Sequence, residues 1–234
     1  MFSSPLLIIF IVFALASYLV SSQLKRRFKQ YSKTALPSGL SGREVAEKML
    51  RDNGITNVAV NSVGGQLSDH YNPANRTVNL SPEVYSGRNV AAAAVAAHEC
   101  GHAIQHARAY APLKMRSALV PLQNVSARIL NFIFIAMFFG AFLLPQVISF
   151  DAALLVIIAC YGIFTAFAFI TLPVEIDATQ RALAWLNTSG ITGGRSHQEA
   201  KDALRWAAYT YVVAALSALA TLLYYVMLFL GRRD

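Results

Sequence analysis

The sequence predicts a mainly α-helical integral membrane protein with four transmembrane helices and a small cytoplasmic α/β domain. Hydrophobic residues make up 56% of the 234 residues and charged residues 14%. Four intervals, 1–24, 129–150, 152–174 and 206–231, contain no Asp, Glu, Lys or Arg. Each is long enough to cross the roughly 30 Å hydrocarbon core as a helix of about 20 residues. This composition excludes a disordered chain and an ordinary water-soluble domain.

The charge-free intervals divide the chain into five segments. These are a transmembrane anchor (1–24), a cytoplasmic region (25–128), a transmembrane hairpin (129–174), a pair of cytoplasmic helices (175–205) and a C-terminal transmembrane helix (206–234). The hairpin should turn near Asp151, and Pro145 should end or kink its first helix. Four buried core helices in a soluble protein would be the alternative, but the rest of the chain offers too little polar cover for them.

Basic residues indicate the orientation in the membrane. None precedes the first apolar run and five follow it, namely Lys25, Arg26, Arg27, Lys29 and Lys33. This asymmetry favours a retained anchor over a cleaved signal and places the following region in the cytoplasm. The two arginines after the last span, Arg232 and Arg233, oppose this rule. The formal net charge of +8 is explained by contact with the lipid bilayer, and no pattern predicts nucleic-acid binding.

The cytoplasmic region reads as a compact mixed domain. Residues 42–53 have apolar positions at helical spacing, and Gly54 follows as a stop. Short strands are expected within 55–63 and over 76–80, and the second could be an ordinary hairpin strand or an edge that pairs with an extended peptide. From about Asn89 an Ala-rich segment predicts a helix whose small side chains allow neighbouring elements to approach closely.

That Ala-rich helix carries His98-Glu99-Cys100-Gly101-His102, an HExxH sequence. Residues four apart lie on one face about 6 Å apart along the axis, so His98 and His102 can converge on one metal ion. Glu99 is offset around the helix, where its carboxylate can accept a proton from a metal-bound water rather than coordinate the metal. The alternative is a helix that carries these residues by chance. Such a helix would place ionisable groups in an apolar run, which costs free energy, without a metal ion to compensate.

A catalytic zinc normally has three protein ligands and one water. His106 is too distant, because eight residues from His98 correspond to about 12 Å of helical rise. Glu175 is the better candidate, since the hairpin returns the chain to the same membrane surface. Pro173 would suit the first turn of a helix there, and Glu175 could instead serve that helix only as an N-terminal carboxylate.

Two neighbours of Glu175 have other expected roles. Asp177 faces elsewhere and is the lesser ligand candidate. Asp177 or Thr179 could hydrogen-bond a ligating histidine, as groups behind metal ligands do.

Together these motifs resemble the membrane-embedded neutral zinc metallopeptidases of bacteria, over residues 1 to 230. The matching segments are 69–73 (DHYNP), 78–82 (VNLSP), 84–85 (VY), 96–105 (AAHECGHAIQ), 172–178 (LPVEIDA) and 207–212 (AAYTYV). The resemblance implies a zincin-like, gluzincin-related domain in which His98, His102 and Glu175 bind one Zn²⁺ per chain and Glu99 is the general base. It also implies a multi-pass protein of the bacterial cell membrane. Cys100 departs from the small residue more usual there and is expected to be a packing thiol.

Other residues have weaker signals. Four polar side chains near the matching motifs could stabilise a developing oxyanion: His70, Tyr71, Tyr209 and Tyr211. Ser196 and Glu199 have capping-box spacing, which predicts a helix start there and makes His197 a surface residue. The Gly-containing loop over 188–194 could act as a lid. Cys100 and Cys160, the only cysteines, are not expected to form a disulfide.

The sequence predicts that the protein is a zinc endopeptidase that cleaves membrane or misfolded proteins at the cytoplasmic membrane surface. Its expected partners are protein or peptide substrates. An unidentified regulatory membrane partner is possible. One rival is a zinc-binding membrane scaffold without proteolytic activity. A second rival is a protease that cuts within the bilayer, which would need the HExxH sequence inside a span. The start of the second span at 129 and the nearby Arg88 and Arg108 argue against that rival.

Overall fold

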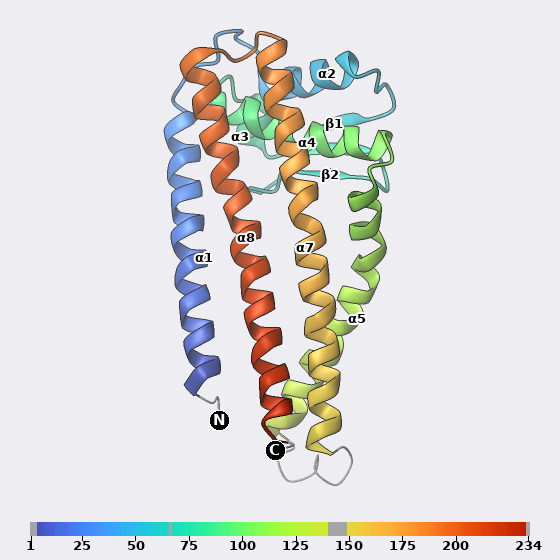
Figure 1. Cartoon of the computed structure of the whole chain (residues 1–234). Coiled ribbons are helices and arrows are strands. Elements are labelled where there is room, and N and C mark those ends of the chain that lie inside the picture. The colour runs from blue at the N-terminus through green and yellow to red at the C-terminus, as the bar shows by residue number, and fades with distance from the viewer. Residues whose placement is uncertain (1–3, 66, 140–148, 233–234) are drawn as a thin grey trace. The chain divides into compact units, whose positions relative to one another are not determined.

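The computed structural model describes residues 4–65, 67–139 and 149–232 and forms two units (Figure 1). The helical unit consists of Met1–Ser17, Met115–Leu172 and Tyr211–Asp234, and the mixed unit of Tyr18–Lys114 and Pro173–Thr210. Pro145 and Arg233, for which the sequence makes predictions, lie outside the described residues.

Four helices within the described ranges are long and apolar enough to cross a membrane, as the sequence predicts. They are α1 (Ser4–Tyr31), α5 (Ala111–Phe139), α7 (Phe150–Thr188) and α8 (Gly194–Leu230). Within the helical unit Leu130 of α5 packs with Leu154 and Ile157 of α7 and with Tyr225 of α8. Asp151, near the expected turn, lies in the first turn of α7 and pairs with Arg232 at 3.5 Å.

Two helices differ from the sequence prediction. Helix α5 begins at Ala111, well before the charge-free interval that starts at 129. It therefore includes three basic residues, Lys114, Arg116 and Arg128. Helix α7 runs without a break through Pro173, where the sequence predicts a new helix (Figure 1). The proline removes one backbone N–H, and a long apolar helix tolerates that loss. Since Glu175 therefore lies inside a helix, the interpretation as an N-terminal carboxylate is wrong.

The mixed unit contains a three-stranded sheet made of β1 (Ala59–Ser62), β2 (His70–Asn72) and β3 (Thr77–Leu80). The strand order is β1-β3-β2, with β1 parallel and β2 antiparallel to β3. Strand β3 is therefore central and paired on both sides. The prediction that residues 76–80 could offer a free edge to a peptide is wrong, because the edge strands of this sheet are β1 and β2.

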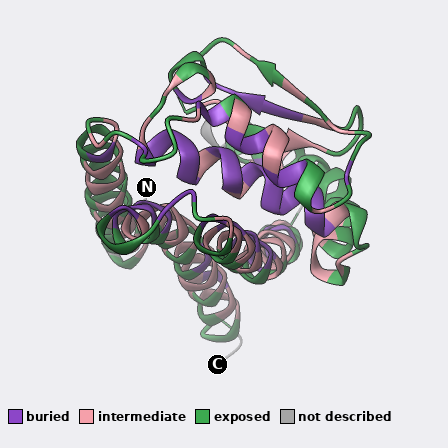
Figure 2. Cartoon of the chain, turned by 90° about the horizontal axis from the view of Figure 1, so that it is seen from above, coloured by how far each residue is buried: buried purple, intermediate pink, exposed green. Residues whose placement is uncertain are grey.

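The core of the mixed unit forms around α4 (Val90–Ala107), which packs with α2 (Gly42–Asp52) and α3 (Pro82–Ser86). Helix α2 begins with a capping box at Ser41 and Glu44, a spacing visible in the sequence but not singled out there. Asn89 caps α4 by accepting a hydrogen bond from the backbone N–H of Ala92. Buried residues run along most of α4 (Figure 2), so this helix is an interior element.

The connection between α7 and α8 also differs from the prediction. Helix α8 begins at Gly194, and Ser196 hydrogen-bonds the backbone of Gly193 while Glu199 pairs with Arg195. The expected capping box is therefore not formed. Ile191 in this loop is buried in the core of the mixed unit, and the end of α7 is about 20 Å of helical rise beyond Glu175. A lid role for this loop stays a prediction.

Candidate metal centre

The site is assembled where α7 approaches α4 very closely. A Cβ atom built on Gly101 would lie 2.6 Å from the backbone oxygen of Ala178, nearer than real Cβ contacts. Glycine is therefore the residue that permits this contact between the two helices. The close approach brings the ligand candidate on α7 within reach of the histidines on α4.

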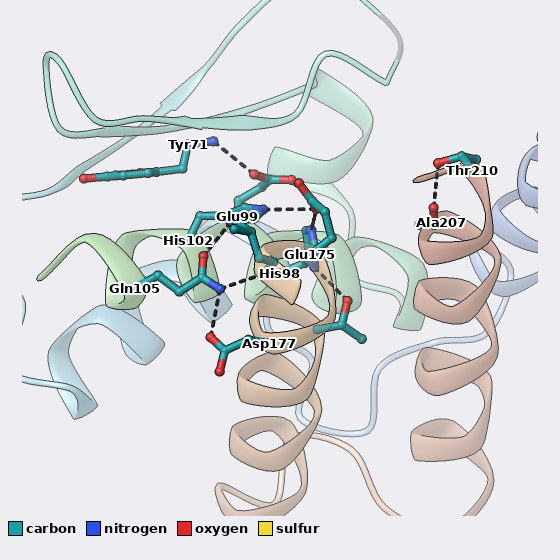
Figure 3. Close-up of polar contacts among 11 residues, drawn as sticks. Tyr71, His98, Glu99, His102, Gln105, Glu175, Asp177, Ala207 and Thr210 are labelled. Atoms are coloured by element: carbon teal, nitrogen blue, oxygen red, sulfur yellow. Dashed lines mark hydrogen bonds and ion pairs between the residues drawn. The ribbon is translucent and has the colours of Figure 1, made fainter. Parts of the chain in front are cut away.

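The three predicted ligand atoms lie within 4.8 Å of one another. Oε2 of Glu175 is 3.3 Å from Nε2 of His98 and 3.4 Å from Nε2 of His102. Figure 3 shows Glu175 directed from α7 toward the histidine pair. Glu175 is only 2% exposed, so its charge needs a positive partner inside the protein.

The donor set fits zinc. Bond lengths of about 2.0–2.2 Å at tetrahedral angles separate neighbouring ligand atoms by about 3.3–3.5 Å. The two distances from Glu175 to the imidazoles fall within that interval, and the whole set of three ligand atoms spans no more than 4.8 Å. The pKa of His102 is raised, because hydrogen bonding to Glu175 and the charges of Glu99 and Glu175 outweigh the lowering effect of burial. The pocket thus attracts positive charge, which a proton or a divalent cation can supply.

Groups on α7 also orient both imidazole rings. Oγ1 of Thr179 lies 3.2 Å from Nδ1 of His98, as one of the sequence hypotheses expects. His102 is approached through Gln105, whose Oε1 lies 3.0 Å from Nδ1 of the histidine. Gln105 in turn donates to Asp177 at 2.8 Å, so Asp177 acts on a histidine through another side chain (Figure 3). In both rings Nε2 is left facing Glu175.

Glu99 lies on the side of α4 that faces β2. The backbone N–H of Tyr71 donates to Oε2 of Glu99 at 3.0 Å (Figure 3). Oε1 of Glu99 has no hydrogen-bond partner within the part of the chain that the structure describes. A carboxylate fixed by one oxygen and open at the other is suited to accept a proton.

Several other candidates make contacts away from the three ligand atoms. Nδ1 of His106 lies 2.7 Å from the hydroxyl of Tyr71, which agrees with its predicted position outside the ligand set. His70 uses both ring nitrogens in its own loop and sheet, donating to the carbonyl of Ser68 and accepting from Asn79. His70 is therefore not available as an oxyanion donor in this arrangement.

The remaining tyrosine candidates are on α8. Tyr209 packs edge-on against Trp206, with ring centroids 5.4 Å apart. Tyr211 belongs to the helical unit. A role for either in oxyanion binding stays a prediction.

Cys100 is a buried packing residue. Its thiol is directed at the backbone oxygen of Ala46 at 3.6 Å, and burial together with the nearby Glu99 raises its pKa. Both cysteines are free and buried, and the sequence likewise predicts that they do not form a disulfide. A thiol with a raised pKa is a poor nucleophile and a poor metal ligand.

Comparison with known proteins assigns the family. Residues 6–230 match the model of the family described as "Putative neutral zinc metallopeptidase". The chain belongs to this zinc metallopeptidase family. It is also 37% identical over 218 residues to the "Putative membrane protease YugP" of Bacillus subtilis (strain 168), a match that covers 93% of each chain. No solved structure matches the chain.

The family assignment agrees with the resemblance inferred from the motifs. It also agrees with the four apolar helices, since the Bacillus subtilis relative is named as a membrane protease. Sequence reasoning did not identify Gln105 and Gly101, although both lie within or beside the HExxH sequence. Their roles depend on contacts with α7, which no local pattern reveals.

Proposed function

We propose that this protein is a zinc-dependent endopeptidase of the bacterial cell membrane. His98, His102 and Glu175 would hold one Zn²⁺, and Glu99 would be the general base. The observation that carries this proposal is the convergence of two imidazole nitrogens and one buried carboxylate oxygen within 4.8 Å. Membership of a zinc metallopeptidase family supports the same chemistry.

Bound zinc would supply a coordinated water with a pKa lowered towards 7 and would polarise the substrate carbonyl. Glu99 would hold the abstracted proton at Oε1, while the backbone N–H of Tyr71 donates to Oε2 and keeps the carboxylate in place. Glu99 later delivers the proton to the leaving amine. Thr179 and Gln105 contact Nδ1 of the two imidazoles, so that Nε2 of each ring faces Glu175, where the ion would be held.

Strand β2 is the proposed guide for the substrate. Because the N–H of Tyr71 is directed at Glu99, the edge of β2 that is not paired with β3 faces the candidate site. An extended peptide could add to that edge by backbone hydrogen bonds. Such binding selects exposed, unfolded segments, so misfolded or membrane proteins with extended loops are the proposed substrates.

The candidate site is proposed to face the cytoplasm. The five basic residues that follow the first span belong to the same unit as the metal ligands. A cysteine placed at exposed Gly64, in the mixed unit, tests this orientation with a membrane-impermeant maleimide. We expect labelling only after the membrane is opened, and labelling of intact cells would contradict the proposal.

Replacement of Glu99 by Gln is the main test. Cleavage of labelled casein by the purified protein in detergent should fall at least about a hundredfold, the lower end of a general base's contribution, while zinc content stays at one per chain. Glu47→Gln, on the surface of α2, is the matched control and should leave both values unchanged. Undiminished cleavage by the Glu99 variant would exclude its role as base.

The rival hypotheses predict other results. A non-proteolytic scaffold would bind zinc, show no cleavage in the wild type and keep its cellular role in the Glu99→Gln strain. A protease that cuts within the bilayer would need α4 to cross the membrane. Among the described residues α4 is not one of the four candidate spans, which supports a site outside the bilayer.

A further inference from the structure

Gln105 joins the two helices that form the candidate metal centre. It lies one turn after His102 on α4 and is 0% exposed. Its side chain makes three contacts: Oε1 with Nδ1 of His102 at 3.0 Å, and Nε2 with the backbone oxygen of Val174 at 2.7 Å and with Oδ2 of Asp177 at 2.8 Å. Both polar atoms of this buried amide, Oε1 and Nε2, therefore have hydrogen-bond partners.

These contacts fix which way the amide points. Both partners of Nε2, a carbonyl and a carboxylate, can only accept hydrogen bonds. A flipped amide would place its oxygen against two acceptors and leave its NH₂ facing the histidine. The oxygen must therefore face His102, and Nδ1 of that ring must carry the proton. In the neutral ring Nε2 of His102 is then the lone-pair nitrogen, and it is the one that faces Glu175.

Asp177 is itself held in place. Arg181 donates to it twice, from Nε at 2.6 Å and from Nη2 at 3.1 Å. A chain of contacts therefore links Arg181, Asp177, Gln105 and His102. Its first two members lie on α7, the helix that also supplies Glu175. A shift of α7 would move Glu175 directly and would move His102 through Gln105.

We propose that Gln105 is a positioning residue that sets the ring orientation and tautomer of His102 from the position of α7. This inference rests on the proposed function. It assigns to Asp177 an indirect role, exerted through an amide instead of a direct carboxylate–histidine bond. His98 differs, because Thr179 has a hydroxyl that can donate or accept and therefore does not fix the tautomer by itself.

The test uses the purified full-length protein in detergent, with zinc affinity measured by chelator competition and the visible spectrum of the Co²⁺-substituted protein. Gln105→Glu puts a carboxylate oxygen against Val174 and Asp177, so we expect zinc affinity to fall about 10–100-fold, as is typical for groups that support a metal ligand, with a changed Co²⁺ spectrum. Asp177→Asn alone keeps an acceptor for Gln105 and should cost less than about 10-fold.

The double variant Gln105→Glu/Asp177→Asn provides the decisive comparison. The amide introduced at position 177 can donate to the carboxylate introduced at position 105 once Arg181, whose side chain is 25% exposed, turns toward solvent. Zinc affinity should therefore recover at least part of the loss seen with Gln105→Glu alone. Gln198→Glu, on the surface of α8, is the matched control and should not change affinity.

Three results would overturn the inference: zinc affinity within about twofold of wild type in Gln105→Glu, an unchanged Co²⁺ spectrum, or no recovery in the double variant. If Gln105→Glu does not fold, Gln105→Met replaces it, because methionine has similar length and no strong donor or acceptor. A normal affinity and spectrum in that variant would equally exclude the role. Absence of zinc binding by the wild type would instead refute the proposed function, so the two failures are distinguishable.

Discussion

Helices α1 and α4 are both rich in apolar side chains, yet they are built for different surroundings. The most apolar window of α1 contains no buried residue, and its large side chains, such as Phe10 and Leu15, are exposed. Most of α4 is buried, and its apolar residues are mainly alanines. Large side chains suit a helix that faces lipid, whereas small ones suit a helix that other backbones must approach.

The difference explains how α4 can carry polar groups. Its small residues let α7 come close enough for Glu175, Thr179 and Asp177 to meet the polar side chains of α4. Buried polar groups are tolerated when each has a partner, and here α7 supplies several of the partners while β2 supplies the N–H that bonds Glu99. Apolar composition alone therefore does not identify the membrane helices in this chain. Side-chain size and the presence of paired polar residues separate the two kinds.

The largest expected effect follows from removing the partner that α7 supplies to both histidines. Glu175→Ala should lower zinc affinity more than about 100-fold, beyond the 10–100-fold loss typical of supporting groups. A chelator should lower the melting temperature of the wild type, because zinc at about 100 times its Kd contributes about 2.7 kcal/mol, and should have no effect on the variant. Equal, stoichiometric zinc in both proteins would remove Glu175 from the site.

Matched isoleucine substitutions compare the two helices directly. Ile104 of α4 is 2% exposed and Ile8 of α1 is 59% exposed. Ile104→Ala should lower the free energy of unfolding by about 2–5 kcal/mol, because it leaves a cavity. Ile8→Ala should change it by no more than about 0.5 kcal/mol. Thermal unfolding in detergent measures both, and similar losses would show that α1 packs as an interior helix.

The close approach of α4 and α7 can be tested at Gly101. Gly101→Ala places a methyl group against the backbone of Ala178, so we expect about 1–3 kcal/mol of destabilisation and weaker zinc binding as α7 is displaced. Gly162→Ala is the control, since a Cβ atom there meets nothing within 4 Å. It should be neutral or slightly stabilising, as alanine favours a helix. A Gly101 variant as stable as wild type would contradict this view of the contact.

The sequence predicted most of what local patterns can encode. The helical spacing of His98 and His102 and the start of the Ala-rich helix near Asn89 are properties of one segment, and the structure has both on α4. The position of Glu175 was predicted from chain topology, since a transmembrane hairpin must return to the side where it began. Zinc binding by these three residues stays a prediction.

Features that depend on distant contacts were not predicted. Strand β3 is central only because β1 and β2 pair on its two sides, and no pattern within residues 76–80 reveals that. Pro173 suggested a helix start, but one missing hydrogen bond is a small cost within a long apolar helix. Gln105 gains its role from Val174 and Asp177, about seventy residues later in the chain. Such pairings require the tertiary fold.

The smallest expected effect concerns the end of α4, where contacts are only partly buried. Tyr71→Phe removes the hydroxyl that meets His106 and keeps the backbone N–H that holds Glu99. Burial raises the pKa of Tyr71, so the hydroxyl stays protonated at neutral pH, and losing its hydrogen bond should cost about 0.5–1.5 kcal/mol. Zinc affinity and casein cleavage should be unchanged. A fall in kcat of about a hundredfold or more would mean that this hydroxyl leaves His106 and serves the oxyanion, the role that the sequence allows for it.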